Sequence, residues 1–231
     1  MSYLSDGLSR AVGLLASGDA ATFSAVAATL MATSLSMFAA LACGLPTGFC
    51  LGYFRFPGKR LFRMVSDAFM AFPTVVIGLL VYAMLSRQGP LGDWGLLFTI
   101  PGMSIGLALL ALPMVVSLTA SAVEQMDSRL RLTLLTLGAD SRQILLGVLW
   151  EARFGVLSGA LAAFGRVVSE VGIAMMVGGN IKWHTRTITT AIALETGKGE
   201  FAQGIALGIV LLAMALILNA ALALLRRRGG P

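Results

Sequence analysis

Five apolar stretches, each long enough to form a membrane-crossing helix, constrain the fold of this chain more than any other feature. An α-helix needs about 20 mainly apolar residues to cross a hydrocarbon core of roughly 30 Å. Only 12% of the 231 residues are charged, against roughly a quarter in a soluble domain. We therefore predict an all-α polytopic membrane protein with five transmembrane helices, over residues 22–53, 64–86, 101–123, 155–178 and 202–225.

The formal net charge of +6 reflects membrane orientation rather than nucleic-acid binding. Basic residues gather at the ends of the apolar stretches, and no basic segment interleaves with stacking aromatic residues. The two cysteines, Cys43 and Cys50, both fall inside the first stretch, at a spacing that fits neither a metal site nor a disulfide. We expect no nucleic-acid partner and no metal site.

The distribution of Lys and Arg predicts the orientation in the membrane. Eleven of the 17 fall in the turn after the first stretch, around residues 129–153 and in the C-terminal tail. Five fall on the opposite face, and Arg166 lies within a stretch. Because cytoplasmic loops are enriched in basic residues, the N-terminus is predicted outside and the C-terminus inside.

The segment TLLTLGADSRQILLGVLWEARFG, residues 133–155, interrupts the apolar pattern. As a sixth crossing it would place Asp140 and Arg142 in lipid, each at a cost of about 2.5–3.5 kcal/mol. It would also move the C-terminal arginines outside. We instead predict a cytoplasmic loop over 124–153 with two short helices, the first ending near Gly138. The second would begin with Asp140 as N-cap and Gln143 completing a capping box.

These loop helices are expected to expose an apolar patch, formed by Leu134, Leu135, Leu137, Ile144 and Leu145. Exposed apolar patches normally mark a contact surface, so a soluble partner would dock there. The alternative is that the patch folds back onto the ends of the chain's own membrane helices.

Two further patterns concern packing. Leu4, Leu8, Val12 and Leu15 recur at helical spacing, which predicts an interfacial helix within residues 1–20, with a frayed tail as the alternative. Glycines spaced four apart predict close helix packing at four places. These are Gly44, Gly48 and Gly52, then Gly102 and Gly106, then Gly155 and Gly159, then Gly204 and Gly208.

Particular motifs resemble a known family, the transmembrane subunits of type I ABC importers. Their cytoplasmic loop signature places a Gly and, farther on, an Ile where this chain has Gly138 and Val148. The motifs GRVVSEVGIAMMVGGNI (165–181), TRTITTAIALETGKGEF (185–201) and WEARFG (150–155) are similar to tungstate permeases, relatives of the molybdate and sulfate permeases. The order of the apolar stretches agrees from about residue 22 onward.

The resemblance implies an assembly of two copies of this chain, two cytoplasmic ATP-binding cassette subunits and an extracytoplasmic oxyanion-binding protein. It also implies that a loop helix seats in a groove on each ATPase. By position, the coupling residues are Leu137, Gly138, Ala139, Asp140, Arg142 and Gln143. The chain has no G-x-x-x-x-G-K-[ST] loop, so ATP and Mg²⁺ are expected on the partner ATPase and no cofactor on this chain.

Arg166 and Glu170 lie four residues apart in the fourth stretch, hence on one helical face, with Ser169 beside them. An opposite-charge pair lowers the cost of burying either residue in a membrane. We expect these residues to line the substrate path or its gate, with Arg166 offering a cation to a passing oxyanion. The alternative is a structural ion pair.

The segment 176–192 is predicted to form the outer mouth, leading into an extracytoplasmic loop over 179–201. Gly178 and Gly179 can aim backbone N–H groups at an anion, with Asn180 and several threonines as further donors. A plain turn between helices explains the glycines equally well. The single histidine, His184, has no second ligand at suitable spacing and is interpreted as a surface residue.

The function predicted from the sequence is the membrane-spanning subunit of an ATP-driven oxyanion importer in the inner membrane. Tungstate is the expected cargo by resemblance, followed by molybdate and then sulfate. Two rivals belong to other classes. A passive anion channel would conduct without a partner, and an intramembrane enzyme using Arg166, Glu170 and His184 would act on a lipid-linked substrate without any ATPase.

Overall fold

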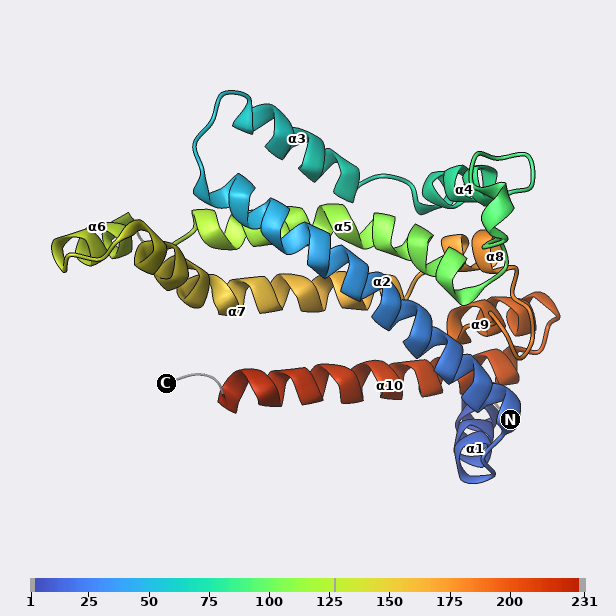
Figure 1. Cartoon of the computed structure of the whole chain (residues 1–231). Helices are drawn as coiled ribbons and strands as arrows, with labels where there is room; N and C mark the ends of the chain where they lie inside the picture. The colour runs from blue at the N-terminus through green and yellow to red at the C-terminus, as the bar shows by residue number, and fades with distance from the viewer. Residues whose placement is uncertain (1–2, 127, 229–231) are drawn as a thin grey trace.

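The computed structural model describes residues 3–126 and 128–228, and within this part the chain is helical with no strand. Residues 1–2 of the predicted interfacial segment, residue 127 of the predicted loop and residues 229–231 lie outside the described residues. The elements, shown in Figure 1, are α1 (Tyr3–Ala16), α2 (Ala20–Tyr53), α3 (Lys59–Met70), α4 (Thr74–Leu85), η1 (Gly92–Trp94), α5 (Ile100–Glu124), α6 (Ser128–Thr136), α7 (Ser141–Val168), α8 (Gly172–Gly178), α9 (Ile188–Gly197) and α10 (Phe201–Arg228).

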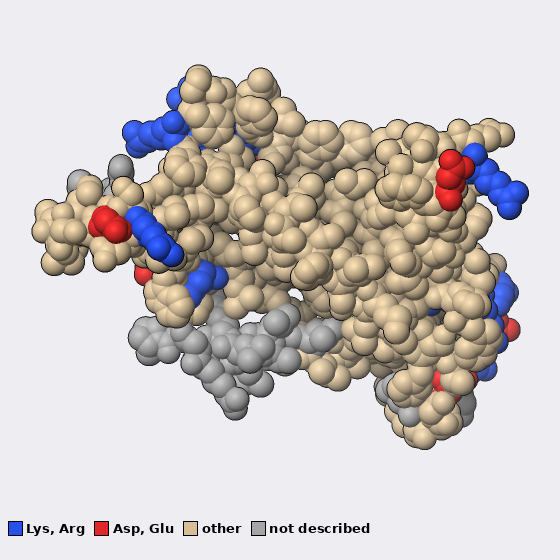
Figure 2. Space-filling model, viewed as in Figure 1, with Lys and Arg blue, Asp and Glu red and all other residues tan. Residues whose placement is uncertain are grey.

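Three long helices form the body of the molecule. Among the described residues α2, α5 and α7 are long and apolar enough to cross a membrane, and the bent pair α3–α4 makes a fourth candidate. The apolar part of α10, Phe201–Ile217, is shorter. In Figure 2 the charged residues gather toward the two ends of the visible face, with an uncharged band between them. This distribution suits helices that cross a bilayer.

The second apolar stretch does not form the single helix that the sequence predicted over 64–86. Helix α3 ends at Met70 and α4 begins at Thr74, and the two axes differ by 94°. Pro73 precedes α4 as its N-cap. A proline lacks the backbone N–H of an interior helical residue and disfavours helical geometry in the residue before it, which explains the break after Phe72.

The fourth stretch also differs from the prediction of one helix over 155–178. Helix α7 already begins at Ser141, so the predicted second loop helix is the first part of a continuous 28-residue helix. It ends at Val168, and a short bend leads into the separate helix α8. The Ser169 hydroxyl donates to the carbonyls of Gly165 and Arg166, at 3.0 and 3.1 Å. Such local bonds compete with helix continuation.

Close glycine contacts join α5 to its neighbours, as the spacing predicted for α2 and α7. A Cβ at Gly48 would lie 2.6 Å from the carbonyl oxygen of Val116, and one at Gly52 would lie 2.8 Å from that of Ala120. A Cβ at Gly159 would lie 2.7 Å from Leu118 Cβ. For Gly208 the prediction was wrong within the described chain, because no other helix comes within 4 Å of the position of its Cβ.

The first helix packs against the last. Ala11 is buried, and a Cβ at Gly7 would collide with Ile205 of α10. Leu8 and Val12, which carried the predicted interfacial pattern, remain exposed on the other side of α1. Asp19 then caps α2, accepting hydrogen bonds from the Thr22 hydroxyl at 2.6 Å and its backbone N–H at 2.7 Å. These two bonds lower the pKa of the Asp19 carboxyl.

Candidate coupling segment and transport pathway

The candidate coupling segment, Leu137–Gln143, comprises the turn between α6 and α7 and the first residues of α7, at one end of the molecule (Figure 1). Gly138 adopts φ +79°, a left-handed conformation that glycine accepts without steric cost. Asp140 accepts the Gln143 N–H at 2.7 Å, and the Gln143 side-chain oxygen accepts the Asp140 N–H at 2.9 Å. The predicted capping box is therefore confirmed.

The predicted apolar patch is divided between the surface and the interior. Leu137 is 77% exposed at the tip of the turn, and Leu135 is also exposed. Ile144 is only 4% exposed and belongs to a core cluster with Phe49 and Val148. Leu134 and Leu145 pack against the same cluster, so the expectation that all five leucine and isoleucine residues are exposed was wrong.

The other predicted coupling residues are also divided between the surface and the interior. Ala139 is half-buried against the core cluster, whereas Gly138, Asp140, Arg142 and Gln143 are exposed. The interior side anchors the turn to α2, α5 and α7, and the outer side presents an apolar tip next to polar side chains. Such a rigid, partly apolar projection is suited to docking in a groove of another protein.

Arg166 and Glu170 are brought together at the far end of α7. The Arg166 Nη1 lies 4.0 Å from the Glu170 Oε2. Their environments differ, because the Arg166 side chain is 45% exposed and the Glu170 side chain only 3%. The sequence predicted the pair on one continuous helix, but Glu170 lies beyond the end of α7, in the bend before α8.

Glu170 also anchors the surrounding backbone. Its Oε1 accepts the Ile173 N–H at 3.2 Å in the first turn of α8, and its carbonyl oxygen accepts the Thr189 hydroxyl at 3.0 Å. Ile173 is fully buried in the main core cluster. Glu170 thus links the bend after α7 to α8 through its carboxylate and to α9 through its backbone carbonyl, while the Arg166 side chain remains partly exposed.

The turn after α8 contains the remaining predicted pathway residues. The Gly178 carbonyl accepts the Thr185 hydroxyl, and Gly179, at φ +72°, packs so closely on Phe98 that a Cβ would lie 2.6 Å from the ring. Asn180, at φ +50°, accepts the Arg186 Nε–H at 3.1 Å. These contacts form a tight turn between α8 and α9, in which Asn180 also holds Arg186.

The threonines of this region were expected to offer hydroxyl donors to an anion, and that expectation was wrong for the described conformation. Thr185, Thr187, Thr189 and Thr190 are buried. Thr187 and Thr190 form the capping box of α9, and Thr189 bonds to Glu170. The segment predicted as an extracytoplasmic loop over 179–201 therefore includes a well-packed helix, α9, whose first turn needs these hydroxyls. His184 is exposed in the preceding turn.

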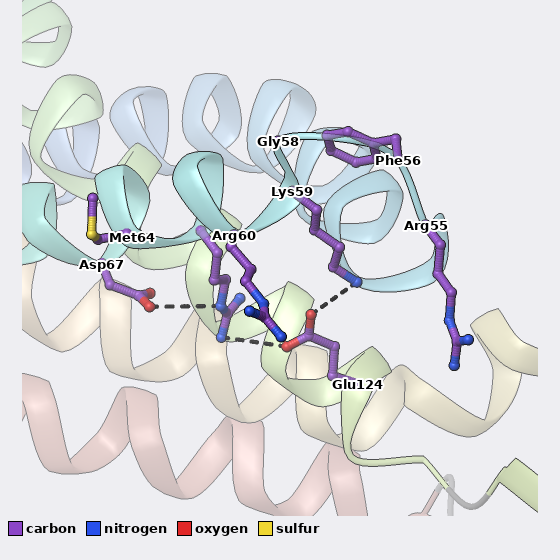
Figure 3. A pocket seen from close by; sticks show the side chains of 9 residues that line it. Arg55, Phe56, Gly58, Lys59, Arg60, Met64, Asp67 and Glu124 are labelled. Carbon is purple, nitrogen blue, oxygen red and sulfur yellow. Dashed lines mark ion pairs between the residues drawn. The ribbon is translucent and has the colours of Figure 1, made fainter.

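Sequence reasoning missed a network of ion pairs at the same end of the molecule as the coupling segment (Figure 3). Lys59 Nζ lies 3.0 Å from Glu124 Oε1, and Arg63 lies 3.6 Å from Asp67 and 3.9 Å from Glu124. Arg63 also donates to the Ser117 carbonyl at 2.8 Å. The i,i+4 spacing of Arg63 and Asp67 was the one signal in the sequence that could have predicted part of this network. No local spacing indicates that Glu124 of α5 joins it.

Residues 44–229 match the family model described as "Binding-protein-dependent transport system inner membrane component". The chain belongs to this family. It is a multi-pass permease subunit of an ABC importer in the inner membrane.

Named relatives refine the comparison. The chain is 45% identical over 219 residues to the tungstate uptake system permease protein TupB of Campylobacter jejuni, covering 95% of this chain and 92% of the relative. It is 38% identical to TupB of Peptoclostridium acidaminophilum, covering 95% and 96%. The molybdenum transport system permease protein ModB of Escherichia coli is 30% identical, covering 84% and 88%. The resemblance to tungstate permeases with molybdate permeases as more distant relatives is thus confirmed.

The fold has a solved counterpart. A chain of the MetNI methionine ABC transporter, in an inward-facing conformation, superposes with a TM-score of 0.72 at 18% sequence identity. The superposition covers 91% of this chain and 97% of that chain. It establishes the importer permease fold.

Proposed function

We propose that this chain forms the translocation path of an ATP-driven oxyanion importer and that its cargo is tungstate. The observation that carries the cargo assignment is the 45% identity to a tungstate permease over nearly the whole of both chains. The working unit would be a homodimer with two cytoplasmic ATPases, which bind ATP and Mg²⁺, and an extracytoplasmic binding protein that delivers the oxyanion.

The shape of α7 supports a mechanical link between the ATPase and the path. This helix begins at the Asp140 cap and runs without interruption to Val168. At 1.5 Å per residue its 28 residues span about 42 Å, more than the thickness of a hydrocarbon core. A displacement of the coupling segment, Leu137–Gln143, would therefore move the distant Arg166–Glu170 bend as part of one rigid body.

The pathway role rests on the contrast between Arg166 and Glu170. A half-exposed guanidinium can bind an oxyanion through charge-assisted hydrogen bonds, and a neighbouring carboxylate weakens that binding enough to allow release. Ser169 lies between them in sequence and is exposed. The outer mouth would be shaped by the tight turn that contains Gly178, Gly179 and Asn180. The buried threonine hydroxyls would not contact the anion directly.

ATP hydrolysis by the reconstituted complex tests this function. With binding protein and ATPase present, we expect tungstate to stimulate hydrolysis more strongly than molybdate, and molybdate more strongly than sulfate, at equal concentration. Matched controls omit the binding protein or replace the oxyanion with chloride. Equal stimulation by all three oxyanions would contradict the tungstate assignment, and stimulation by none would contradict oxyanion import altogether.

The alternatives predict different results in the same preparation. A molybdate permease would be stimulated most strongly by molybdate, and a sulfate permease by sulfate. A passive anion channel would give conductance from the isolated chain in a bilayer without ATP. An intramembrane enzyme would convert a lipid-linked substrate without the ATPase.

A further inference from the structure

A basic cavity opens where the turn between α2 and α3 meets the end of α5. Its volume is about 860 Å³. Six of the residues that line it are ionisable, and they comprise four bases, Arg55, Lys59, Arg60 and Arg63, and two acids, Asp67 and Glu124. Fully ionised, these side chains leave two positive charges in excess.

The excess can be assigned to particular residues. Lys59 and Arg63 are paired with Glu124 and Asp67 at 3.0 to 3.9 Å. Arg55 and Arg60 are exposed, and within the described part of the chain neither forms an ion pair. Figure 3 shows both side chains at the cavity, and no dashed line marks an ion pair of either one. Two guanidinium groups therefore remain available for an anion.

The surface next to this cavity is apolar. Phe56 and Met64 line the cavity itself and are exposed. Along α3 the side chains of Leu61, Phe62 and Val65 are 59%, 62% and 41% exposed. Figure 1 shows α3 leading from the basic turn along α2 and α5 toward the middle of the molecule. A charged end followed by an exposed apolar face matches a molecule with an anionic head and hydrocarbon chains.

We propose that this cavity binds the phosphate of an acidic phospholipid, with Arg55 and Arg60 as the principal contacts and the acyl chains along the exposed face of α3. Guanidinium groups bind phosphate oxygens in bidentate geometry, and basic pockets beside membrane helices hold anionic head groups. Free phosphate or another small oxyanion shares the head-group chemistry but makes no use of the apolar face. With only a small anion bound, the apolar side chains of α3 would remain exposed.

Lipid retention by the full-length chain tests the proposal. The chain is purified into mixed phosphatidylglycerol and phosphatidylcholine, and bound lipid is counted by native mass spectrometry. The parent is expected to retain phosphatidylglycerol selectively. Arg55→Gln with Arg60→Gln should lower that retention about 30-fold, since each basic residue near a membrane surface contributes about 1 kcal/mol. The matched control, Arg10→Gln with Arg87→Gln, removes two exposed charges elsewhere and should retain lipid like the parent.

Three outcomes would overturn the proposal. They are equal retention of both lipids by the parent, loss of phosphatidylglycerol in the control as well, and full displacement of the lipid by excess inorganic phosphate. The last would assign the cavity to a free anion. Arg55→Lys with Arg60→Lys keeps both charges and should preserve most of the retention. If the glutamine variant fails to fold, the salt dependence of the parent still tests the proposal. Selective retention of phosphatidylglycerol should weaken as salt concentration rises, and retention that is insensitive to salt would contradict binding through Arg55 and Arg60.

Discussion

Substituting tryptophan for Gly138 is expected to abolish oxyanion uptake while the protein still inserts in the membrane. Gly138 lies at φ +79° beside the exposed tip of the candidate coupling segment, and apart from its two chain neighbours no described residue lies within 4 Å of the position of its missing Cβ. A side chain there costs about 1–2 kcal/mol in backbone strain and adds bulk where the ATPase would dock. Loss of a central interface contact costs about 2 kcal/mol or more, so ATPase association should fall about 30-fold.

Gly18→Trp is the matched control for this variant. Gly18 has φ +66° and likewise has open space around the Cβ position, but it lies between α1 and α2. The strain is therefore similar and the location different. Co-purification of the ATPase with each variant, together with tungstate uptake, measures the effect. Normal uptake and normal ATPase association by Gly138→Trp would contradict the proposal that this turn couples to the ATPase.

Arg166→Gln is expected to lower tungstate uptake about tenfold or more with little change in stability. The pair with Glu170 is long, at 4.0 Å, and Arg166 is nearly half exposed, so its contribution to the free energy of unfolding should stay below about 1 kcal/mol. Losing a contact with the passing anion costs more, because a hydrogen bond to a charged group contributes about 1.5–3 kcal/mol. Uptake into vesicles and thermal unfolding measure the two effects separately.

The double variant Arg166→Gln with Glu170→Gln separates a pathway role from a structural ion pair. Glutamine at position 170 can still accept the Ile173 N–H, so the anchoring of α8 is retained. If the pair is only structural, removing both charges restores uptake toward the parental rate. We expect uptake to stay low in the double variant, since the cation that meets the oxyanion is still missing.

Hydropathy and capping patterns predicted most of the helical framework. Apolar length located α2, α5 and α7, and the Asp140 and Gln143 spacing predicted the start of α7, because both signals depend on neighbours in sequence. The glycine spacing on α2 predicted its contact with α5 for the same reason: the helix itself places these residues on one face.

Features set by distant contacts were beyond these patterns. The bend at Pro73 has a local signal, but its angle of 94° depends on how α4 packs on α8 and α5. The burial of Ile144 depends on Phe49, nearly a hundred residues away in sequence. After α8, the Ile188 N–H donates to Thr29 of α2, and the Thr189 hydroxyl donates to the carbonyl of Glu170. Hydropathy and local spacing do not represent tertiary partners, so they could not predict that these side chains are buried.

Thiol labelling of the coupling segment tests the central claim most directly. Leu137→Cys places a reactive group at a position of the turn that is 77% exposed, in a chain whose native cysteines, Cys43 and Cys50, are replaced by serine. Lys182→Cys, in the exposed turn after α8, is the control for the opposite face. With a membrane-impermeant maleimide, we predict that Leu137→Cys reacts only in inverted vesicles and Lys182→Cys only in intact cells. Labelling of Leu137→Cys in intact cells would contradict the account.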